Sequence, residues 1–267
     1  MQDNWINYLC EYYGVSQEEA IILGTRSPGR TPSLPGSDTC NAVSNMTMED
    51  IWELKERKKE SDIFDFYKDQ GAWSAFRQTI RHIELFSYHE SFWNSIDVNY
   101  AHICEYGCGV APFVTSLLLN SPNDIFVDIS LTDIAGCEHL HFAEWKLNKI
   151  IEERDMKNVV LDICPVKPNK LPSYESDLNV VILYEVIEHV PSPVKTMTNL
   201  MNQMTEGSVI LENFVDHGHS DNNNDGPDLH SAASERDGFY DILKSNFKIV
   251  YGDSNTNTNQ TRLWQKQ

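Results

Sequence analysis

From residue 98 onward, short apolar runs alternate with longer segments of helical periodicity. This alternation predicts βαβ units and a mainly parallel sheet, and therefore an α/β fold. Seven runs are predicted to be strands, over residues 101–105, 129–133, 158–163, 180–184, 208–212, 247–251 and 261–265. The last two are separated by residues 252–260, too few for a parallel crossover. We therefore expect them to form an antiparallel hairpin at the edge of the sheet.

The first 97 residues show helical periodicity instead. A first helix is indicated by apolar side chains at helical spacing: Trp5, Ile6, Leu9, Tyr12 and Tyr13. Ser16, followed by two acids, marks the start of a second helix, and further helices are expected from Thr47 and over residues 73–86. Three prolines within residues 24–36 predict a long loop. We therefore divide the chain into an N-terminal helical cap or lid region, residues 1–97, and a core domain, residues 98–267.

The charge balance narrows the range of partners. Forty acidic residues against 21 basic ones give a formal net charge of -19, which repels the phosphates of nucleic acids. A small or cationic substrate therefore fits better than DNA or RNA. No run of 18 apolar residues is present, so no membrane span is expected. The six cysteines form no CxxC pair and the N-terminus resembles no export signal, so a reduced, cytoplasmic setting is predicted.

A glycine loop follows the first predicted strand. Residues 103–112 read ICEYGCGVAP, and a helix is expected to follow over residues 113–119. Glycines at 107 and 109 permit a tight turn and a close approach to a ligand. The amides at the start of the helix are expected to be free to face that ligand. A dinucleotide fingerprint has glycine at its sixth position, where this chain has Pro112, and this argues against NAD.

The pattern acid-x-Gly-x-Gly-x-small, from Glu105 to Ala111, resembles motif I of the class I methyltransferases that use S-adenosylmethionine. The resemblance implies a Rossmann-like, doubly wound, seven-stranded and mostly parallel sheet, to which the helical periodicity of the first 97 residues adds an N-terminal helical appendage. It implies a cofactor site at the loop, formed by Glu105, Tyr106, Gly107, Cys108 and Gly109.

Further cofactor contacts are expected at the ends of the next strands. Asp133 follows the loop at the spacing of an acid that binds ribose hydroxyls, with Ile134 beside it. In the family, the end of the following strand contacts adenine, which implicates Asp162 and Ile163 here. Tyr184 and Glu185, after the fourth strand, are expected to border the same pocket.

Residues 183–191, LYEVIEHVP, resemble the segment that follows the fourth strand in ubiquinone-biosynthesis O-methyltransferases. The resemblance covers about residues 101–214. If residues 185–190 turn helically, Glu185, Glu188 and His189 project from one face, and such a set suits Mg2+, Mn2+ or Zn2+. Metal-dependent small-RNA 2'-O-methyltransferases share this Glu-x-x-Glu-His pattern. The alternative is a metal-free segment, in which Glu185 borders the cofactor pocket, Glu188 is solvated, and His189 caps a helix or contacts the acceptor.

Histidines are the candidate proton acceptors. His217, His219 and His230 follow the fifth strand, at the sheet edge where α/β proteins bind ligands. An imidazole that titrates near neutrality can take a proton from a hydroxyl or an amine during methyl transfer. We expect His189, together with one of these three, to face the acceptor.

The sequence therefore predicts a methyltransferase that transfers a methyl group from S-adenosylmethionine to an oxygen or nitrogen atom of a small molecule. Two alternatives stay open. One is a metal-dependent RNA-terminal 2'-O-methyltransferase, which the net charge of -19 disfavours. The other is a regulatory module that binds S-adenosylmethionine without turnover. The identity of the acceptor and the formation of a homodimer are not determined by the sequence.

Overall fold

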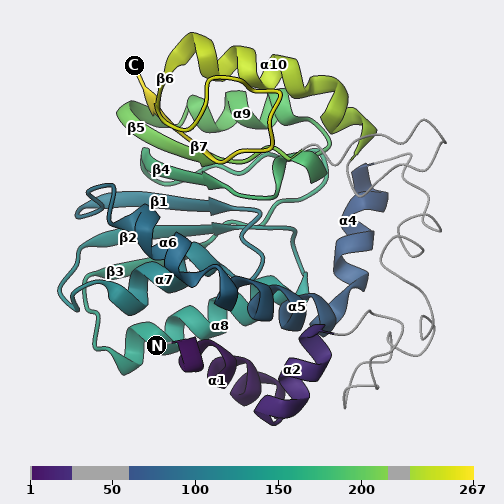
Figure 1. The fold of residues 1–267 in the computed structure, drawn as a ribbon, viewed down its shortest axis with the longest axis vertical. Coiled ribbons are helices and arrows are strands. Elements are labelled where there is room, and N and C mark those ends of the chain that lie inside the picture. The colour runs from purple at the N-terminus through teal and green to yellow at the C-terminus, as the bar shows by residue number, and fades with distance from the viewer. Residues whose placement is uncertain (1, 26–59, 216–228) are drawn as a thin grey trace.

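The computed structural model describes residues 2–25, 60–215 and 229–267. Its centre is one seven-stranded sheet with the strand order β3-β2-β1-β4-β5-β7-β6 (Figure 1). The strands are β1 (Ala101–Tyr106), β2 (Val127–Thr132), β3 (Val159–Ile163), β4 (Leu178–Leu183), β5 (Met204–Glu212), β6 (Phe247–Tyr251) and β7 (Arg262–Lys266). The first five pair in parallel, and β7 runs antiparallel to both β5 and β6. The predicted α/β fold, its seven strands and the antiparallel pair at one edge are confirmed.

The central strands are largely buried because helices cover both faces of the sheet. All six residues of β1 are buried. On β4, Val180 and Ile182 join one hydrophobic cluster, and Val181 and Leu183 join the other, since alternate side chains point to opposite faces. The first cluster also contains residues of α7 (Pro112–Asn120) and α8 (Glu138–Glu153), and the second contains residues of α9 (Pro193–Met201) and α10 (His230–Asn246).

Five described helices precede β1. They are α1 (Gln2–Tyr13), α2 (Gln17–Thr25), α4 (Glu60–Asp69), α5 (Gly71–Glu84) and α6 (Phe86–Trp93). Ser16 begins α2 as expected: its hydroxyl accepts the Glu19 amide at 3.2 Å, and its own amide donates to the Glu19 carboxylate at 2.8 Å, which forms a capping box. The single helix expected over residues 73–86 is instead two helices, α5 and α6, which meet at Leu85.

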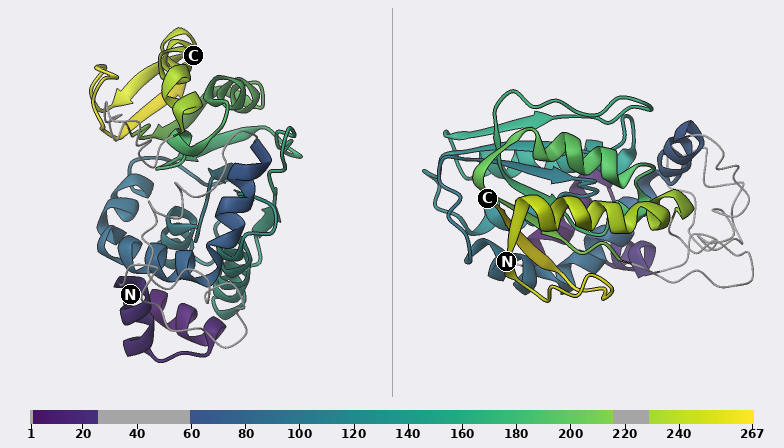
Figure 2. Two further views of the ribbon diagram at one scale, coloured as in Figure 1. Left: turned by 90° about the vertical axis from the view of Figure 1, so that its right-hand side faces the viewer. Right: turned by 90° about the horizontal axis from the view of Figure 1, so that it is seen from above.

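The N-terminal helices share the core of the sheet domain. Leu9, Phe76 and Trp93 lie in the same cluster as Phe113 of α7 and Phe142 of α8. In contrast, α4 packs on the opposite face, where its Ile63 and Phe66 join the second cluster. Figures 1 and 2 show α1 and α2 at the far end of the molecule from the β6–β7 pair. The helices α4 and α5 flank the carboxyl ends of the central strands (Figure 1).

Some expectations fall on residues that the structure does not describe. These are the loop from residue 26 onward, the helix expected from Thr47, and the histidines at 217 and 219. Among the described residues, none of the helices combines the length and the apolar character that a membrane crossing requires.

Candidate cofactor and acceptor site

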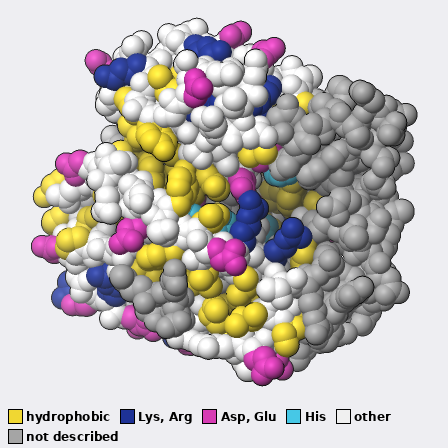
Figure 3. Space-filling model, in the orientation of Figure 1, with side chains coloured by type: hydrophobic (Ala, Val, Ile, Leu, Met, Phe, Trp, Pro, Cys, Tyr) yellow, Lys and Arg dark blue, Asp and Glu magenta, His cyan; other side chains and the backbone are white. Residues whose placement is uncertain are grey.

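A cavity of about 570 Å3 opens at the carboxyl ends of β1, β2 and β4, between α4 and α5. In Figure 3, basic side chains and a histidine surround the hollow in the middle of this face. Most of the expected cofactor residues line the cavity: Glu105, Tyr106, Gly107, Cys108, Gly109, Asp133, Ile134, Tyr184 and Glu185. Asp162 and Ile163 do not line it, and Asp162 is exposed at the end of β3. The cavity thus gathers the expected cofactor residues with the exception of the adenine pair.

The loop between β1 and α7 has a conformation that requires its glycines. Gly107 and Gly109 have φ angles of 62° and 51°, in the left-handed region that side chains disfavour. A Cβ atom at Gly107 would lie 1.9 Å from a Val186 methyl carbon, and one at Gly109 would lie 2.0 Å from Gln78 Oε1. The loop is therefore held between the segment that follows β4 on one side and α5 on the other.

Glu105 organises the start of α7. Its buried carboxylate accepts the amides of Phe113 at 3.2 Å and Val114 at 2.9 Å, two of the donors that a helix N-terminus leaves unsatisfied. Burial raises the pKa of Glu105 to about 8, although these two amides and Lys146 favour the ionised form. The expectation that these amides are free to face a ligand is wrong, because the acid of the motif itself occupies them.

The amides of residues 108 to 111 are also engaged within the protein. Their acceptors are Thr132 O for Cys108, the Asp133 carboxylate for Gly109, Gln78 Oε1 for Val110, and Cys108 O for Ala111. Pro112 has no amide hydrogen. Every amide donor from residue 108 to residue 114 is therefore already used. The groups that remain for a ligand are carbonyl oxygens of the loop and the neighbouring carboxylates.

Asp133 follows β2 and is 8% exposed. Its Oδ2 accepts the Gly109 amide at 2.7 Å, and its Oδ1 accepts the Ile134 amide at 2.6 Å. The same Oδ1 lies 3.3 Å from Nε2 of His139, at the start of α8. Burial opposes ionisation of Asp133, but His139 and the two amides hold its pKa below the ordinary value. Conversely, burial would lower the pKa of His139, but Asp133 raises it to about 10. The two side chains therefore form a buried ion pair at neutral pH.

Cys137 lies beside this ion pair, and one potential ligand atom from each of Asp133, Cys137 and His139 lies within 4.8 Å of the others. Hydrogen bonds account for this arrangement. The Ser74 hydroxyl donates to Gly71 O at 3.0 Å, so it accepts the Nδ1 hydrogen of His139 across 3.1 Å. With Nε2 donating to Asp133, both ring nitrogens carry hydrogens and neither has a lone pair for a metal ion.

The segment after β4 differs from the expectation. Glu185 has a φ angle of 53°, and only Ile187–His189 form a short helical turn, η3. Glu185 is therefore not on a helical face with Glu188 and His189, and the expected turn over residues 185–190 is wrong. These three side chains do not form a metal-ligand cluster in the described part of the chain.

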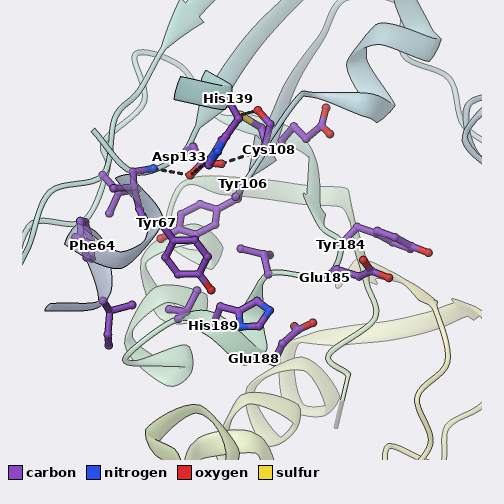
Figure 4. Close-up of a pocket in the computed structure, with 18 of the residues that line it drawn as sticks. Phe64, Tyr67, Tyr106, Cys108, Asp133, His139, Tyr184, Glu185, Glu188 and His189 are labelled. Atoms are coloured by element: carbon purple, nitrogen blue, oxygen red, sulfur yellow. Dashed lines mark hydrogen bonds and ion pairs between the residues drawn. The ribbon is translucent and has the colours of Figure 1, made fainter. Parts of the chain in front are cut away.

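Each of the three has a different environment. Glu185 Oε1 lies 2.5 Å from Nη2 of Arg81, and Glu188 is 1% exposed, so the alternative in which Glu188 is solvated is also wrong. His189 is half-buried and lines the cavity, with its ring 6.1 Å from that of Tyr67. Figure 4 shows His189 beside Tyr67, and Glu185 beside Tyr184. Of the other candidate histidines, His230 begins α10, and its side chain lies outside the described part, as do His217 and His219.

The strand order, the single antiparallel strand β7 and the glycine loop at the end of β1 together decide the fold. The chain has the class I methyltransferase fold.

No protein-family model and no curated protein matches the sequence. Among solved structures, PigF with SAH has a TM-score of 0.50 at 15% identity, over 79% of this chain and 63% of PigF. The pyocyanin biosynthetic protein PhzM has a TM-score of 0.49 at 12% identity, over 81% of this chain and 64% of PhzM. An Aquifex aeolicus SAM-dependent methyltransferase has a TM-score of 0.48 at 12% identity, over 83% of this chain and 98% of its own. The chain thus spans less than two thirds of PigF and PhzM, and the likeness concerns the fold.

On this class I core, α4 and α5, in the region predicted to be a cap or lid, supply cavity residues that were not among the candidate site residues. Phe64 and Tyr67 come from α4, and Trp73, Arg77 and other residues come from α5. The Arg77 guanidinium lies 5.4 Å from the centre of the Trp73 ring. The sequence of α5 does indicate a polar face, because Ser74, Gln78 and Arg81 recur at the spacing of one side of a helix.

Proposed function

We propose that this chain is an S-adenosylmethionine-dependent methyltransferase that acts on an oxygen or nitrogen atom of a small-molecule acceptor. The observation that carries the proposal is the polarity of the glycine loop. A loop that binds phosphate offers its amides to the ligand, whereas here the amides from residue 108 to residue 114 are engaged within the protein. Beside the loop, Asp133 keeps an ionised carboxylate, and one of its oxygens accepts a single amide. Acceptors of this kind suit a ligand that brings hydrogen-bond donors, and S-adenosylmethionine brings an ammonium group and ribose hydroxyls.

The cavity suits this cofactor in size and in its polar groups. A volume of about 570 Å3 is in the ordinary range for small-molecule sites. Asp133 Oδ2 accepts one amide among the described residues, which leaves it capacity for a ribose hydroxyl. Since Asp162 is exposed and does not line the cavity, the apolar side chains of Ile134 and Val166 would flank the adenine instead. When bound, the cofactor supplies an electrophilic methyl group.

The acceptor would occupy the part of the cavity between α4 and η3. Phe64, Tyr67 and Trp73 give it an aromatic wall suited to a planar molecule. His189, beside Tyr67, is placed to take the proton that the acceptor loses. Methyl transfer is an in-line displacement, so the main contribution of the walls is alignment. Proton removal by a positioned imidazole typically contributes about 100-fold to 10,000-fold in rate.

The test follows tritium from the labelled methyl group of S-adenosylmethionine into a panel of small hydroxyl and amine compounds, with RNA as a separate arm. The wild-type protein is compared with Asp133→Asn and with Asp128→Asn, a matched change at an exposed acid of β2, the strand that Asp133 follows. We expect transfer to a small molecule by the wild type and by Asp128→Asn, and loss of transfer in Asp133→Asn. Label found only in RNA would contradict the small-molecule acceptor. Tight cofactor binding without transfer to any compound would favour the regulatory module.

A further inference from the structure

A chain of buried hydrogen bonds joins α5 to the glycine loop. It runs from the Ser74 hydroxyl to His139 Nδ1 at 3.1 Å, from His139 Nε2 to Asp133 at 3.3 Å, and from Asp133 to the Gly109 amide at 2.7 Å. Each of the three side chains is at least nine-tenths buried. These hydrogen bonds link residues that lie up to 65 positions apart in sequence, and they pass through the Asp133 carboxylate, which the proposed function assigns to the ribose.

A second contact joins the same helix to the same loop. Gln78 Oε1 accepts the Val110 amide at 3.1 Å. Ser74 and Gln78 are four residues apart and therefore lie on one face of α5. The Gln78 side chain also fills the space beside Gly109 that a Cβ atom would occupy. Through these two contacts α5 determines the acceptors of two consecutive loop amides, those of Gly109 and Val110.

We propose that Ser74, Gln78 and His139 are positioning residues for the cofactor: they fix the glycine loop and the Asp133 carboxylate in the conformation that binds S-adenosylmethionine. The inference rests on the proposed function. The physical reason is that a buried amide without an acceptor is costly, so loss of either contact allows the loop to seek another conformation. Cofactor affinity then depends on α5, which precedes the whole sheet in sequence. By linkage, the bound cofactor must in turn stabilise the packing of α5.

Two variants test the contacts, and two matched variants serve as controls. Ser74→Ala and Gln78→Ala each remove one contact. Ser116→Ala makes the same change at a fully buried serine of α7, and Thr79→Val removes a buried hydroxyl from α5 itself. Neither control hydroxyl has a hydrogen-bond partner among the described residues, and neither residue lines the cavity. The controls therefore report the effect of altered packing alone.

The first measurement is calorimetric titration of the full chain with S-adenosylmethionine. Loss of one hydrogen bond of ordinary strength weakens binding about fivefold, so we expect that loss in Ser74→Ala and in Gln78→Ala, and less than about a twofold change in the controls. Turnover at saturating cofactor is expected to stay within about twofold of the wild type, so that the KM for the cofactor changes and kcat does not. Equal affinities in Ser74→Ala and Ser116→Ala would overturn the inference.

The second measurement needs no cofactor and separates this inference from the proposed function. Amide hydrogen exchange in the cofactor-free protein reports the loop directly. We expect exchange at Gly109 to quicken in Ser74→Ala and exchange at Val110 to quicken in Gln78→Ala, each by about fivefold or more. Unchanged exchange at both amides would overturn the contact of α5 with the loop. If exchange quickens in the two variants as expected but the wild type does not bind S-adenosylmethionine, the proposed function fails and the positioning of the loop stands.

Discussion

Replacement of His139 by glutamine tests the buried ion pair that holds Asp133. The imidazolium of His139 lies 3.3 Å from the Asp133 carboxylate, and both side chains are buried. Asp133 raises the pKa of His139 from 6.5 to about 10 against the effect of burial. This change corresponds to about 5 kcal/mol of folding stability, because a tenfold change in proton affinity is worth about 1.4 kcal/mol.

Glutamine keeps an N–H donor for Asp133 and thereby recovers about 1 kcal/mol. We therefore expect His139→Gln to lower the free energy of unfolding by about 4 kcal/mol at about pH 6, in the range measured for broken buried ion pairs. The sign of the pH dependence follows from the raised pKa in the folded state. The stabilisation is complete below pH 6.5, the pKa of the unfolded chain, and is lost as the pH rises to about 10.

The assay is urea unfolding of the wild type and the variant at a series of pH values from about 6 to about 10. Burial lowers the pKa of Lys146 to about 7, but Lys146 is present in both proteins and its effect cancels in the difference. His141→Gln, at an exposed position of the same helix, is the control and is expected to be neutral. A difference that stays constant or grows with pH would refute the reasoning.

Three further predictions concern the cavity. His189→Ala is expected to reduce kcat by about 100-fold or more while the Kd for S-adenosylmethionine stays within about threefold, as measured by turnover and calorimetry; equal losses of both would assign this residue to cofactor binding or folding. Arg81→Met breaks a partly exposed pair with Glu185 and is expected to change the free energy of unfolding by less than about 1 kcal/mol, so a larger loss in urea unfolding would contradict that assignment. Gly107→Ala is expected to destabilise the protein by at least about 1 kcal/mol more than Gly136→Ala, because both have positive φ angles but only the first Cβ atom would clash; equal melting temperatures would count against the tight loop.

The sheet and the glycine loop could be predicted because they depend on local pattern. The buried central strands are rich in apolar residues, and the shortness of residues 252–260 fixes the direction of β7 relative to β6. Gly107 and Gly109 indicated the tight loop after β1 because the backbone there needs residues without a side chain. These features are set by residues within about ten positions of one another.

Other features depend on the direction in which the backbone leaves a strand. The spacing of Glu185, Glu188 and His189 suggested one helical face, but the left-handed conformation of Glu185 separates it from the other two. Similarly, Asp162 is an exposed residue near the end of β3. The residue that lines the cavity is Val166, which follows the strand. A pattern of residue types does not determine these backbone angles.

The contacts of α5 could not be predicted because they join distant parts of the chain. Ser74 meets His139 across 65 positions, and Gln78 meets Val110 across 32. The same limitation explains why the loop amides were expected to be free. Their acceptors are backbone and side-chain oxygens of β2, α5 and Glu105, and the sequence of the loop alone does not indicate them.

The central claim is that the loop after β1 receives S-adenosylmethionine and not a phosphate, because its amides from residue 108 to residue 114 are engaged within the protein. Titration calorimetry of the wild-type chain against S-adenosylmethionine and, separately, against NAD tests it most directly. The account predicts one molecule of S-adenosylmethionine bound per chain and no measurable heat with NAD. Saturable binding of NAD without binding of S-adenosylmethionine would contradict it.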